Sequence, residues 1–352
     1  MFDDTRLDDP QVLSRSDQRL RFLAESGARV RAEVGLAADR IADLGEQGMP
    51  RAVVGAGKGA RLLRAVLEST CPVPFVAWPG PGLPGWAGPL DTVVVLAQAV
   101  DDVSAATASA EARRRGSTLI LTSTRESQIE LLAAGPYTTV LRTQSDDSLA
   151  GAVVLLQAMA RLGLGPRVDG EEVADVLDDV AARCSPFTDS ATNPAKRLVL
   201  ALGDGTPLLW GGSVLAARAA RRVAEAVRRS TGRPAFAANV DLLLPVLERA
   251  PAKDVFADPF EPGGQQSRPS VLIVDDGAED PSITAERDRL AEAADQFDVP
   301  VECVTATHGP ELARYAGAVG IGSYVAAYLG IALDGETRPD TTEPGSAPDG
   351  GA

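Results

Sequence analysis

Short apolar runs alternate with stretches of helical periodicity along the first half of the chain. The run Thr92–Leu96 reads TVVVL, and the other runs are similarly short and bounded by turn residues. Continuous apolar strands joined through helices are typical of parallel strands that are covered on both faces. We therefore predict a doubly wound α/β domain, with strands at 51–54, 74–78, 92–96, 118–121 and 138–141 and helices at 20–44, 60–68 and 126–134. A further Ala-rich helix, capped by Asp101 or Asp102, ends at 113–116.

The same alternation begins again in the second half. Two helices, 149–164 and 171–182, lead out of the first domain. We then predict strands at 198–202, 208–210, 235–238, 271–274 and 299–304, and helices at 214–229, 284–297 and 311–333. The chain thus divides into an N-terminal helix plus first domain (1–160), a helical connection (161–194), a second α/β domain of similar plan (195–335) and a tail (336–352). The tail is polar and rich in Pro and Gly, which predicts disorder, and 263–269 is predicted to be an exposed loop.

Composition excludes several classes of function. Acidic residues outnumber basic ones, 49 to 34, for a net charge of −15, which disfavours nucleic acid and anionic membranes as partners. His308 is the only histidine, and the three cysteines are widely spaced, so neither a zinc site nor a disulfide framework is indicated. We predict no metal and no cofactor. The N-terminus lacks the apolar core of a signal peptide, and no apolar run reaches about 18 residues, so we expect a soluble, cytoplasmic protein.

Two glycine clusters each lie between a predicted strand and a predicted helix. The first contains Gly57, Lys58 and Gly59, and the second contains Gly211, Gly212 and Ser213. Such a turn presents backbone N–H groups at the positive end of a helix, which suits a phosphate group, and Lys58 and Ser213 add side-chain donors. The first cluster fits neither the Walker A spacing nor GxGxxG. Turns that only allow close helix–strand packing are the alternative.

Polar side chains also follow other strands. Thr122, Ser123 and Thr124 lie at the carboxyl end of a strand, where open α/β sheets bind ligands, although they could simply cap the next helix. His308 stands between a strand and the last helix, as a general acid or base or as a surface residue. Asp275–Asp276 could bind a metal or a sugar hydroxyl, although no third metal ligand is visible and a solvated loop is the alternative.

Three segments of the second half resemble one protein family. They are LALGDGTPLLWGGSVLAARAARRVAEA at 200–226, GRPAF at 232–236 and IGSYVAAYL at 321–329. They are similar to the sugar isomerase (SIS) superfamily, in particular its two-domain bacterial and archaeal phosphoglucose/phosphomannose isomerases, and to the actinobacterial TobH-type members associated with mannose metabolism. The resemblance extends over about residues 20–335. It implies two tandem SIS domains, a hexose 6-phosphate ligand (mannose, glucose or fructose 6-phosphate), aldose–ketose isomerisation and a homodimer.

The chain departs from the family pattern at the catalytic positions. The family's catalytic Glu aligns near Arg228 and Arg229, its His near Pro245 and its active-site Arg near Asp146 and Asp147, with Arg142 nearby. The Ser-rich phosphate loop is replaced by 96–101, and no lysine follows Lys253. Glu225 and His308 remain as candidate catalytic groups. The alternative is a non-catalytic SIS protein that senses a sugar phosphate or regulates a partner enzyme. A third possibility is a structural dimer without ligand.

The resemblance also predicts where a ligand would lie. If the two domains face each other, residues 57–59, 122–124 and 211–213 converge on one cleft, with His308 at its rim. The helices 149–164 and 312–333 carry more small and apolar residues than one face needs, which favours a homodimer.

Overall fold

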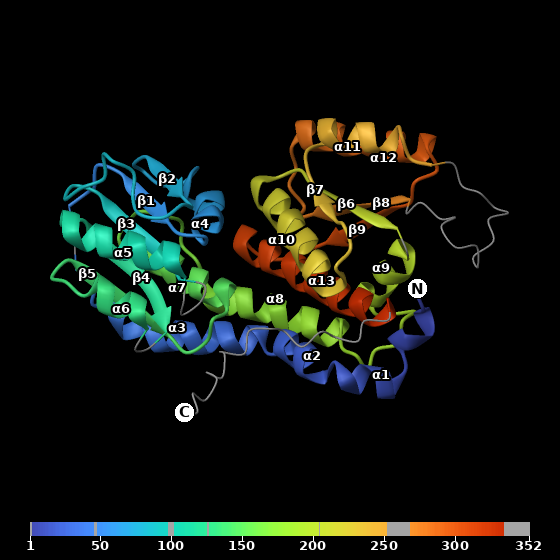
Figure 1. Cartoon of the computed structure of the whole chain (residues 1–352), viewed down its shortest axis with the longest axis horizontal. Coiled ribbons are helices and arrows are strands. Elements are labelled where there is room, and N and C mark those ends of the chain that lie inside the picture. Colours follow the sequence, from blue (N-terminus) through green and yellow to red (C-terminus); the bar gives the residue numbers. More distant parts are fainter. Residues whose placement is uncertain are drawn as a thin grey trace, which may run out of the picture.

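Two parallel sheets, one in each half of the chain, form the framework of the protein (Figure 1). The structure is a computed structural model that describes residues 2–45, 48–97, 102–124, 127–203, 205–251 and 268–333. The strand orders are β2-β1-β3-β4-β5 and β7-β6-β8-β9, and every strand pair is parallel. The strands are β1 (Val53–Ala56), β2 (Phe75–Trp78), β3 (Thr92–Leu96), β4 (Thr118–Thr124), β5 (Thr138–Thr143), β6 (Thr206–Gly211), β7 (Phe236–Ala237), β8 (Pro269–Asp275) and β9 (Val301–Thr305). The predicted α/β class with parallel sheets is confirmed.

Helices cover both faces of each sheet. Helices α3 (Ser26–Ala42), α4 (Ala60–Leu67) and α7 (Ser148–Arg161) lie on one face of the first sheet, and α5 (Val103–Arg115) and α6 (Gln128–Ala133) lie on the other. In the second half, α10 (Val214–Thr231) and α13 (Glu311–Ala332) lie opposite α11 (Val240–Leu247) and α12 (Pro281–Gln296). The remaining helices are η1 (Asp4–Leu7), α1 (Pro10–Arg15), α2 (Asp17–Ala24), α8 (Gly170–Arg183) and α9 (Pro194–Leu202).

One continuous hydrophobic core joins the two halves. It includes Leu63 of α4, Val154 of α7, Val223 of α10 and Tyr328 of α13. Small residues bring these helices close together: a Cβ at Gly322 would lie 2.1 Å from a methyl carbon of Val223. Separate smaller cores fill the space under α5 and α6 and under α11 and α12.

The small and apolar residues of α7 and α13 are covered within a single chain. Every residue from Ala150 to Leu156 is buried, and so is most of α13. The composition of these helices is therefore no longer a reason to expect a homodimer. The homodimer stays a prediction from the family resemblance. Helix α13 is long and apolar enough to cross a membrane, in contrast to the expectation from the sequence that no run was. However, 78% of its apolar window is buried in the fold, as in the core helix of a water-soluble domain.

Several sequence predictions differ from the structure. The predicted strand 198–202 is the second half of α9, because Asn193 caps a helix there and accepts hydrogen bonds from the backbone N of Ala195 and Lys196, at 3.0 and 3.1 Å. The predicted helix 20–44 is divided between α2 and α3 at Glu25, and α11 was not predicted. Pro269 begins β8 rather than ending a loop.

One of the two candidate cap residues for the Ala-rich helix of the first half is its cap in the structure. Asp102 caps α5, accepting from the backbone N of Ser104 and Ala105, both at 3.1 Å. Helix α6 is capped by Ser127. Asp101, Glu126, Lys253, residues 263–267 and the tail 336–352 lie outside the described residues.

The N-terminal segment packs against the second half of the chain, although it was predicted as part of the first domain. The backbone N of Asp3 donates to the carbonyl oxygen of Ala332 at 2.8 Å, and Arg6 Nε donates to that of Ile331 at 2.8 Å. Leu7 is fully buried. Helix α3, in contrast, runs alongside α7 and α8 and reaches the end of β5.

Candidate functional site

The first glycine turn leads from β1 into α4 and contains one basic residue, Lys58. Gly57 has φ +79°, a conformation that favours glycine, and its N–H donates to the carbonyl oxygen of Trp78 at 3.1 Å. A Cβ at Gly59 would lie 2.6 Å from Cβ of Leu96, so this glycine allows α4 to approach the end of β3. Lys58 is exposed and has no partner among the described residues. The turn therefore combines a packing role with an available ammonium group.

The hydroxyl groups at the end of β4 point into the protein. Thr122 is buried, and its Oγ1 has no hydrogen-bond partner and lies close to Gly151 of α7. The Oγ atoms of Ser123 and Ser127 are 2.5 Å apart, and Ser127 Oγ also caps α6 by accepting from the backbone N of Glu130 at 3.2 Å. Thr124 is half-buried at the end of the strand. The cap of α6 is thus Ser127 and none of the three predicted residues, although Ser123 contacts the capping hydroxyl.

Two carboxylates occupy helix N-termini in the first domain. Asp102 is 4% exposed, and its Oδ2 has no hydrogen-bond partner. Glu33 is buried at the turn between β5 and α7, where it accepts from the backbone N of Gln144 and Ser145 at distances down to 2.7 Å. Because a carboxylate repels a second anion, neither turn is suited to a phosphate group.

The second glycine turn leads from β6 into α10 and is closed by an acidic side chain. Ser213 Oγ accepts from the backbone N of Ala216 at 3.0 Å and donates to the Asp276 carboxylate. A Cβ at Gly211 would lie 2.3 Å from the carbonyl carbon of Ala216, and one at Gly212 would lie 2.2 Å from a methyl carbon of Ile283. The two glycines therefore allow tight packing. The Ser213 hydroxyl is already used by a carboxylate.

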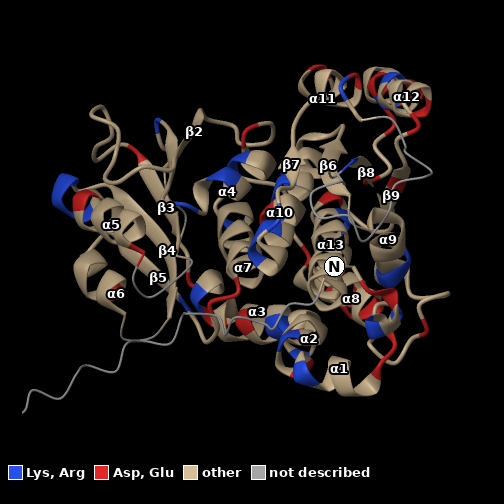
Figure 2. Ribbon diagram, turned by 45° about the vertical axis from the view of Figure 1, so that its right-hand side comes forward, with Lys and Arg blue, Asp and Glu red and all other residues tan. Residues whose placement is uncertain are grey.

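Helices α4 and α10, which follow the two glycine turns, contact each other between the sheets. Figure 2 shows their basic segments in adjacent positions. The contact between α4 and α10 joins the two helices that follow the glycine turns. We call the α4–α10–α13 contact region the domain junction.

The two candidate catalytic residues have different surroundings. Glu225 lies in the fourth turn of α10, where its Oε2 is 3.1 Å from Nη1 of Arg222. It also interacts electrostatically with Arg218 and Tyr315, which places its carboxylate at the domain junction. His308 is exposed on the loop between β9 and α13, beyond the edge strand of the second sheet.

Arg218 at the domain junction was not identified from the sequence. Its side chain is half-buried and its Nε is fully enclosed without a hydrogen-bond partner. Burial lowers the pKa of Arg218 below its ordinary value; the charges of Arg222 and Arg61 act in the same direction, and Tyr315 and Glu225 oppose them. Arg218 is one of several arginines along α10, so its sequence context gives no signal that distinguishes it.

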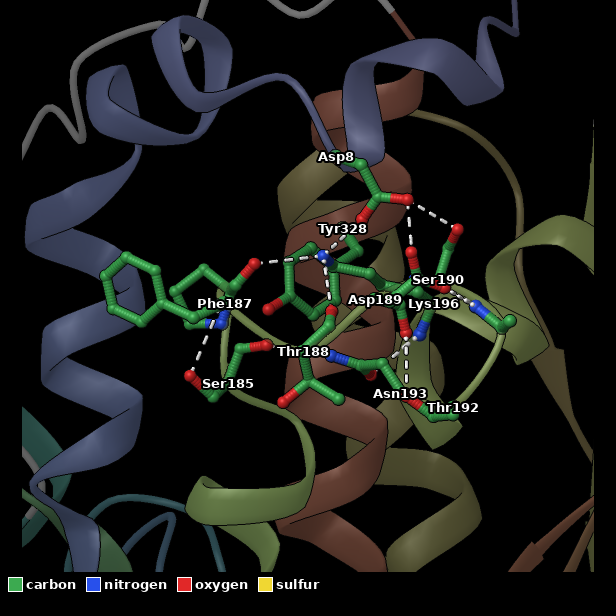
Figure 3. Close-up of polar contacts among 12 residues, drawn as sticks. Asp8, Ser185, Phe187, Thr188, Asp189, Ser190, Thr192, Asn193, Lys196 and Tyr328 are labelled. Carbon is green, nitrogen blue, oxygen red and sulfur yellow. Dashed lines mark hydrogen bonds and ion pairs between the residues drawn. The ribbon is translucent and has the colours of Figure 1, made fainter.

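A second interior cation, Lys196, was also missed. Its side chain is fully buried, and Nζ donates to the Asp8 carboxylate at 2.7 Å and to the carbonyl oxygens of Pro186 and Thr188 at 3.0 and 2.9 Å (Figure 3). Nζ also lies 5.4 Å from the centre of the Tyr328 ring. All three ammonium donors are used. This network fixes the loop before α9 to the N-terminal segment and leaves no donor for a ligand.

Comparison with known proteins finds similarity to an SIS domain in the second half of the chain. Residues 191–339 match the family described as the bacterial phospho-glucose isomerase C-terminal SIS domain. A glucose-6-phosphate isomerase like protein from Thermus thermophilus has a similar structure, with a TM-score of 0.51 at 17% identity over 94% of this chain and 93% of that one. The C-terminal domain of glucosamine-fructose-6-phosphate aminotransferase from Francisella tularensis gives a TM-score of 0.59 at 9% identity, covering 88% of this chain and 95% of that one. None of the curated proteins matches the sequence.

Proposed function

We propose that the chain is a phosphosugar isomerase of the two-domain phosphoglucose/phosphomannose type, which binds a hexose 6-phosphate in the cytoplasm. The observation that carries this proposal is the match of residues 191–339 to a phospho-glucose isomerase SIS domain. The likeness of nearly the whole chain to a glucose-6-phosphate isomerase like protein supports the same fold in the first half. The ligand of the proposal is mannose, glucose or fructose 6-phosphate.

The proposed binding site lies where the carboxyl edges of the two sheets approach each other. The contact between α4 and α10 supports this location, because it joins the helices that follow residues 57–59 and 211–213. Lys58 is the cation of the first turn that is free to meet a ligand. Ser213 contributes less, since Asp276 already accepts its hydroxyl proton.

Isomerisation between an aldose and a ketose requires a base that moves a proton between C1 and C2 and an acid that opens the sugar ring. Glu225 is the proposed base, because its carboxylate lies among the cations of the domain junction. Arg222, which is 3.1 Å from Glu225, would stabilise the negative charge that develops on an enediolate. His308 is the alternative proton donor and is expected to matter only if the ligand extends to the end of β9.

The activity test is a coupled assay that interconverts glucose, mannose and fructose 6-phosphates with purified protein. We expect turnover above about 1 per second, within the usual range of enzymes, and a loss of at least about a hundredfold in Glu225→Gln. Binding of a hexose 6-phosphate without turnover would instead identify the non-catalytic SIS protein. Absence of both binding and turnover would contradict the proposal.

Lys58 provides a separate test of the site. Charge-assisted hydrogen bonds contribute about 1.5–3 kcal/mol, so Lys58→Ala is expected to weaken binding of a hexose 6-phosphate about tenfold or more. Arg64→Ala is the matched control, because Arg64 is exposed on α4 and is paired with Glu68. If Lys58→Ala binds as tightly as the wild type, the first glycine turn serves only packing.

The proposal includes a homodimer, as the family resemblance implies. Light scattering is expected to give about twice the chain mass of 36.5 kDa. A monodisperse species at the chain mass would contradict the dimer and leave the sugar-phosphate site to the single chain.

A further inference from the structure

Arg218 is a half-buried cation that the described protein leaves without a partner. It lies in the second turn of α10, its Nε is enclosed, and no described residue forms a hydrogen bond or ion pair with it. Burial of an ionised group without a partner is costly, and such groups in folded proteins are normally paired. The guanidinium of Arg218 therefore has unused hydrogen-bonding capacity at the domain junction.

The surrounding charges make this position still less favourable in the absence of a ligand. Arg222 and Arg61 both act on Arg218 as like charges, and Glu225 is the carboxylate that opposes them. Glu225 is itself engaged by Arg222 at 3.1 Å. The carboxylate that opposes the like charges around Arg218 is therefore already paired with Arg222, in a chain whose net charge is −15.

Helix polarity adds to the positive potential. Arg61 lies in the first turn of α4, and Arg218 lies near the start of α10. Cations are disfavoured at helix N-termini, where the helix dipole is positive and anions are stabilised. Arg61 therefore adds its charge to the positive end of α4, and Arg218 lies one turn further into its own helix.

Several arginines in the described part of the chain have carboxylate partners. Arg29 pairs with Asp147 at 2.9 Å, and Arg51 pairs with Asp91 at 2.6 Å. Arg31 pairs with three carboxylates, each at 2.6 Å. Arg268 and Arg314 also have an enclosed Nε without a partner, but their guanidinium groups donate to carbonyl oxygens. Arg218 differs from both because it forms no hydrogen bond with any described residue.

We propose that Arg218, together with Arg61, binds the phosphoryl group of the ligand at the domain junction. A phosphate monoester carries two negative charges and several acceptor oxygens, and it matches the forked donors of a guanidinium. The inference rests on the proposed function for the identity of the ligand as a sugar phosphate. It assigns the phosphate to α10 and α4 rather than to the Ser213 turn, which Asp276 closes.

The test compares three proteins in a phosphate-free buffer of low ionic strength: the wild type, Arg218→Gln and Arg221→Gln. Arg221 is exposed on the same helix and serves as the matched control. Each is titrated calorimetrically with inorganic phosphate, glucose 6-phosphate and glucose. We expect Arg218→Gln to bind both phosphate compounds at least about tenfold more weakly, and Arg221→Gln to remain within about twofold of the wild type. Arg61→Gln, on an exposed position of α4, is expected to bind the phosphate compounds about threefold more weakly than the wild type. This variant tests the site even if Arg218→Gln does not fold.

The outcomes separate this inference from the proposed function. If the wild type binds glucose 6-phosphate and Arg218→Gln binds it equally well, the arginine site is wrong and the proposed function stands. If inorganic phosphate binds through Arg218 but glucose 6-phosphate binds no more tightly than phosphate, the arginine site stands and sugar recognition fails. If the wild type binds neither phosphate compound, both are overturned.

Discussion

Lys196 and Arg218 are both interior cations, but their surroundings differ. Lys196 is fully buried, and its ammonium group donates to one carboxylate and two carbonyl oxygens. Arg218 is half-buried, next to two further arginines, and has no partner among the described residues. A cation whose donors are all used by the protein is explained by the fold. One whose donors are unused indicates a ligand from outside.

The two cations also have different roles in this acidic chain. Lys196 connects the loop before α9 with Asp8 of the N-terminal segment, so its energetic contribution is to stability. Arg218 adds positive charge where α10 meets α4, with no stabilising contact in return. Substitution by Met should therefore lower the stability of the protein at position 196 and slightly raise it at position 218.

The largest expected effect is the loss of stability in Lys196→Met. Removal of this ammonium leaves the carbonyl oxygens of Pro186 and Thr188 without their donor, and each acceptor left unsatisfied costs about 1–3 kcal/mol. The Asp8 carboxylate is 41% exposed and keeps its hydrogen bond from Ser190, so it adds little to this loss. Urea unfolding should show a lower midpoint with an unchanged slope. Arg197→Met, at the exposed neighbouring position, is the control and should change stability by less than about 0.5 kcal/mol. A wild-type midpoint for Lys196→Met would show that the network contributes little.

The second effect concerns ligand-linked stability. A ligand present at 100 times its dissociation constant stabilises a folded protein by about 2.7 kcal/mol. Saturating glucose 6-phosphate should therefore raise the unfolding temperature of the wild type and of Lys196→Met alike. It should raise that of Arg218→Met by much less. Equal shifts in all three proteins would remove the functional distinction between the two cations.

The third effect is smaller and depends on pH. Burial acts to raise the pKa of Asp8, but hydrogen bonds from Lys196 and Ser190 outweigh it, so the pKa lies below its ordinary value of 3.8. A lowered pKa in the folded state means that the ionised carboxylate stabilises the protein above pH 3.8 and that this contribution is lost as the pH falls through the folded pKa. Because the Asp8 side chain is 41% exposed and solvent screens its charge, we expect Asp8→Asn to cost less than about 1 kcal/mol at neutral pH and nothing at strongly acidic pH, measured by unfolding at a series of pH values. A pH-independent difference would contradict the ionic contribution of Asp8.

The smallest effect is on the stability of Arg218→Met without ligand. This substitution removes a cation that has two like-charged neighbours and no partner among the described residues. The free energy of unfolding should therefore increase, by less than about 1 kcal/mol. Arg221→Met should leave stability unchanged, because Arg221 is exposed. A loss of about 2 kcal/mol or more in Arg218→Met would mean that Arg218 has a structural role like that of Lys196.

The fold could largely be predicted from the sequence because its signals are local. The apolar run Thr92–Leu96 is buried throughout as β3, and Asp102 caps the helix that follows it. The run Leu198–Leu202 was misassigned because a short apolar segment is compatible with a strand and with a buried helix. The N-cap residue, Asn193, lies five residues before Leu198, and its hydrogen bonds to the first turn favour the helix.

The site could be predicted only in part, because its decisive contacts join distant segments. Ser213 was expected to offer its hydroxyl, but Asp276, which lies 63 residues further on, accepts it. Nothing in the sequence of α10 distinguishes Arg218 from Arg221. Packing of α10 against α4 and α13 leaves Arg221 exposed and half-buries Arg218, and it is this difference that identifies the candidate anion site.

The most direct test is a crystal structure of the protein with glucose 6-phosphate or fructose 6-phosphate bound. The account predicts that the phosphate oxygens lie within about 3 Å of the Arg218 guanidinium, between α4 and α10, with the sugar directed toward the turn that contains Lys58. A phosphate group bound at the Ser213 turn or at the N-terminus of α5, with Arg218 still without a partner, would contradict it.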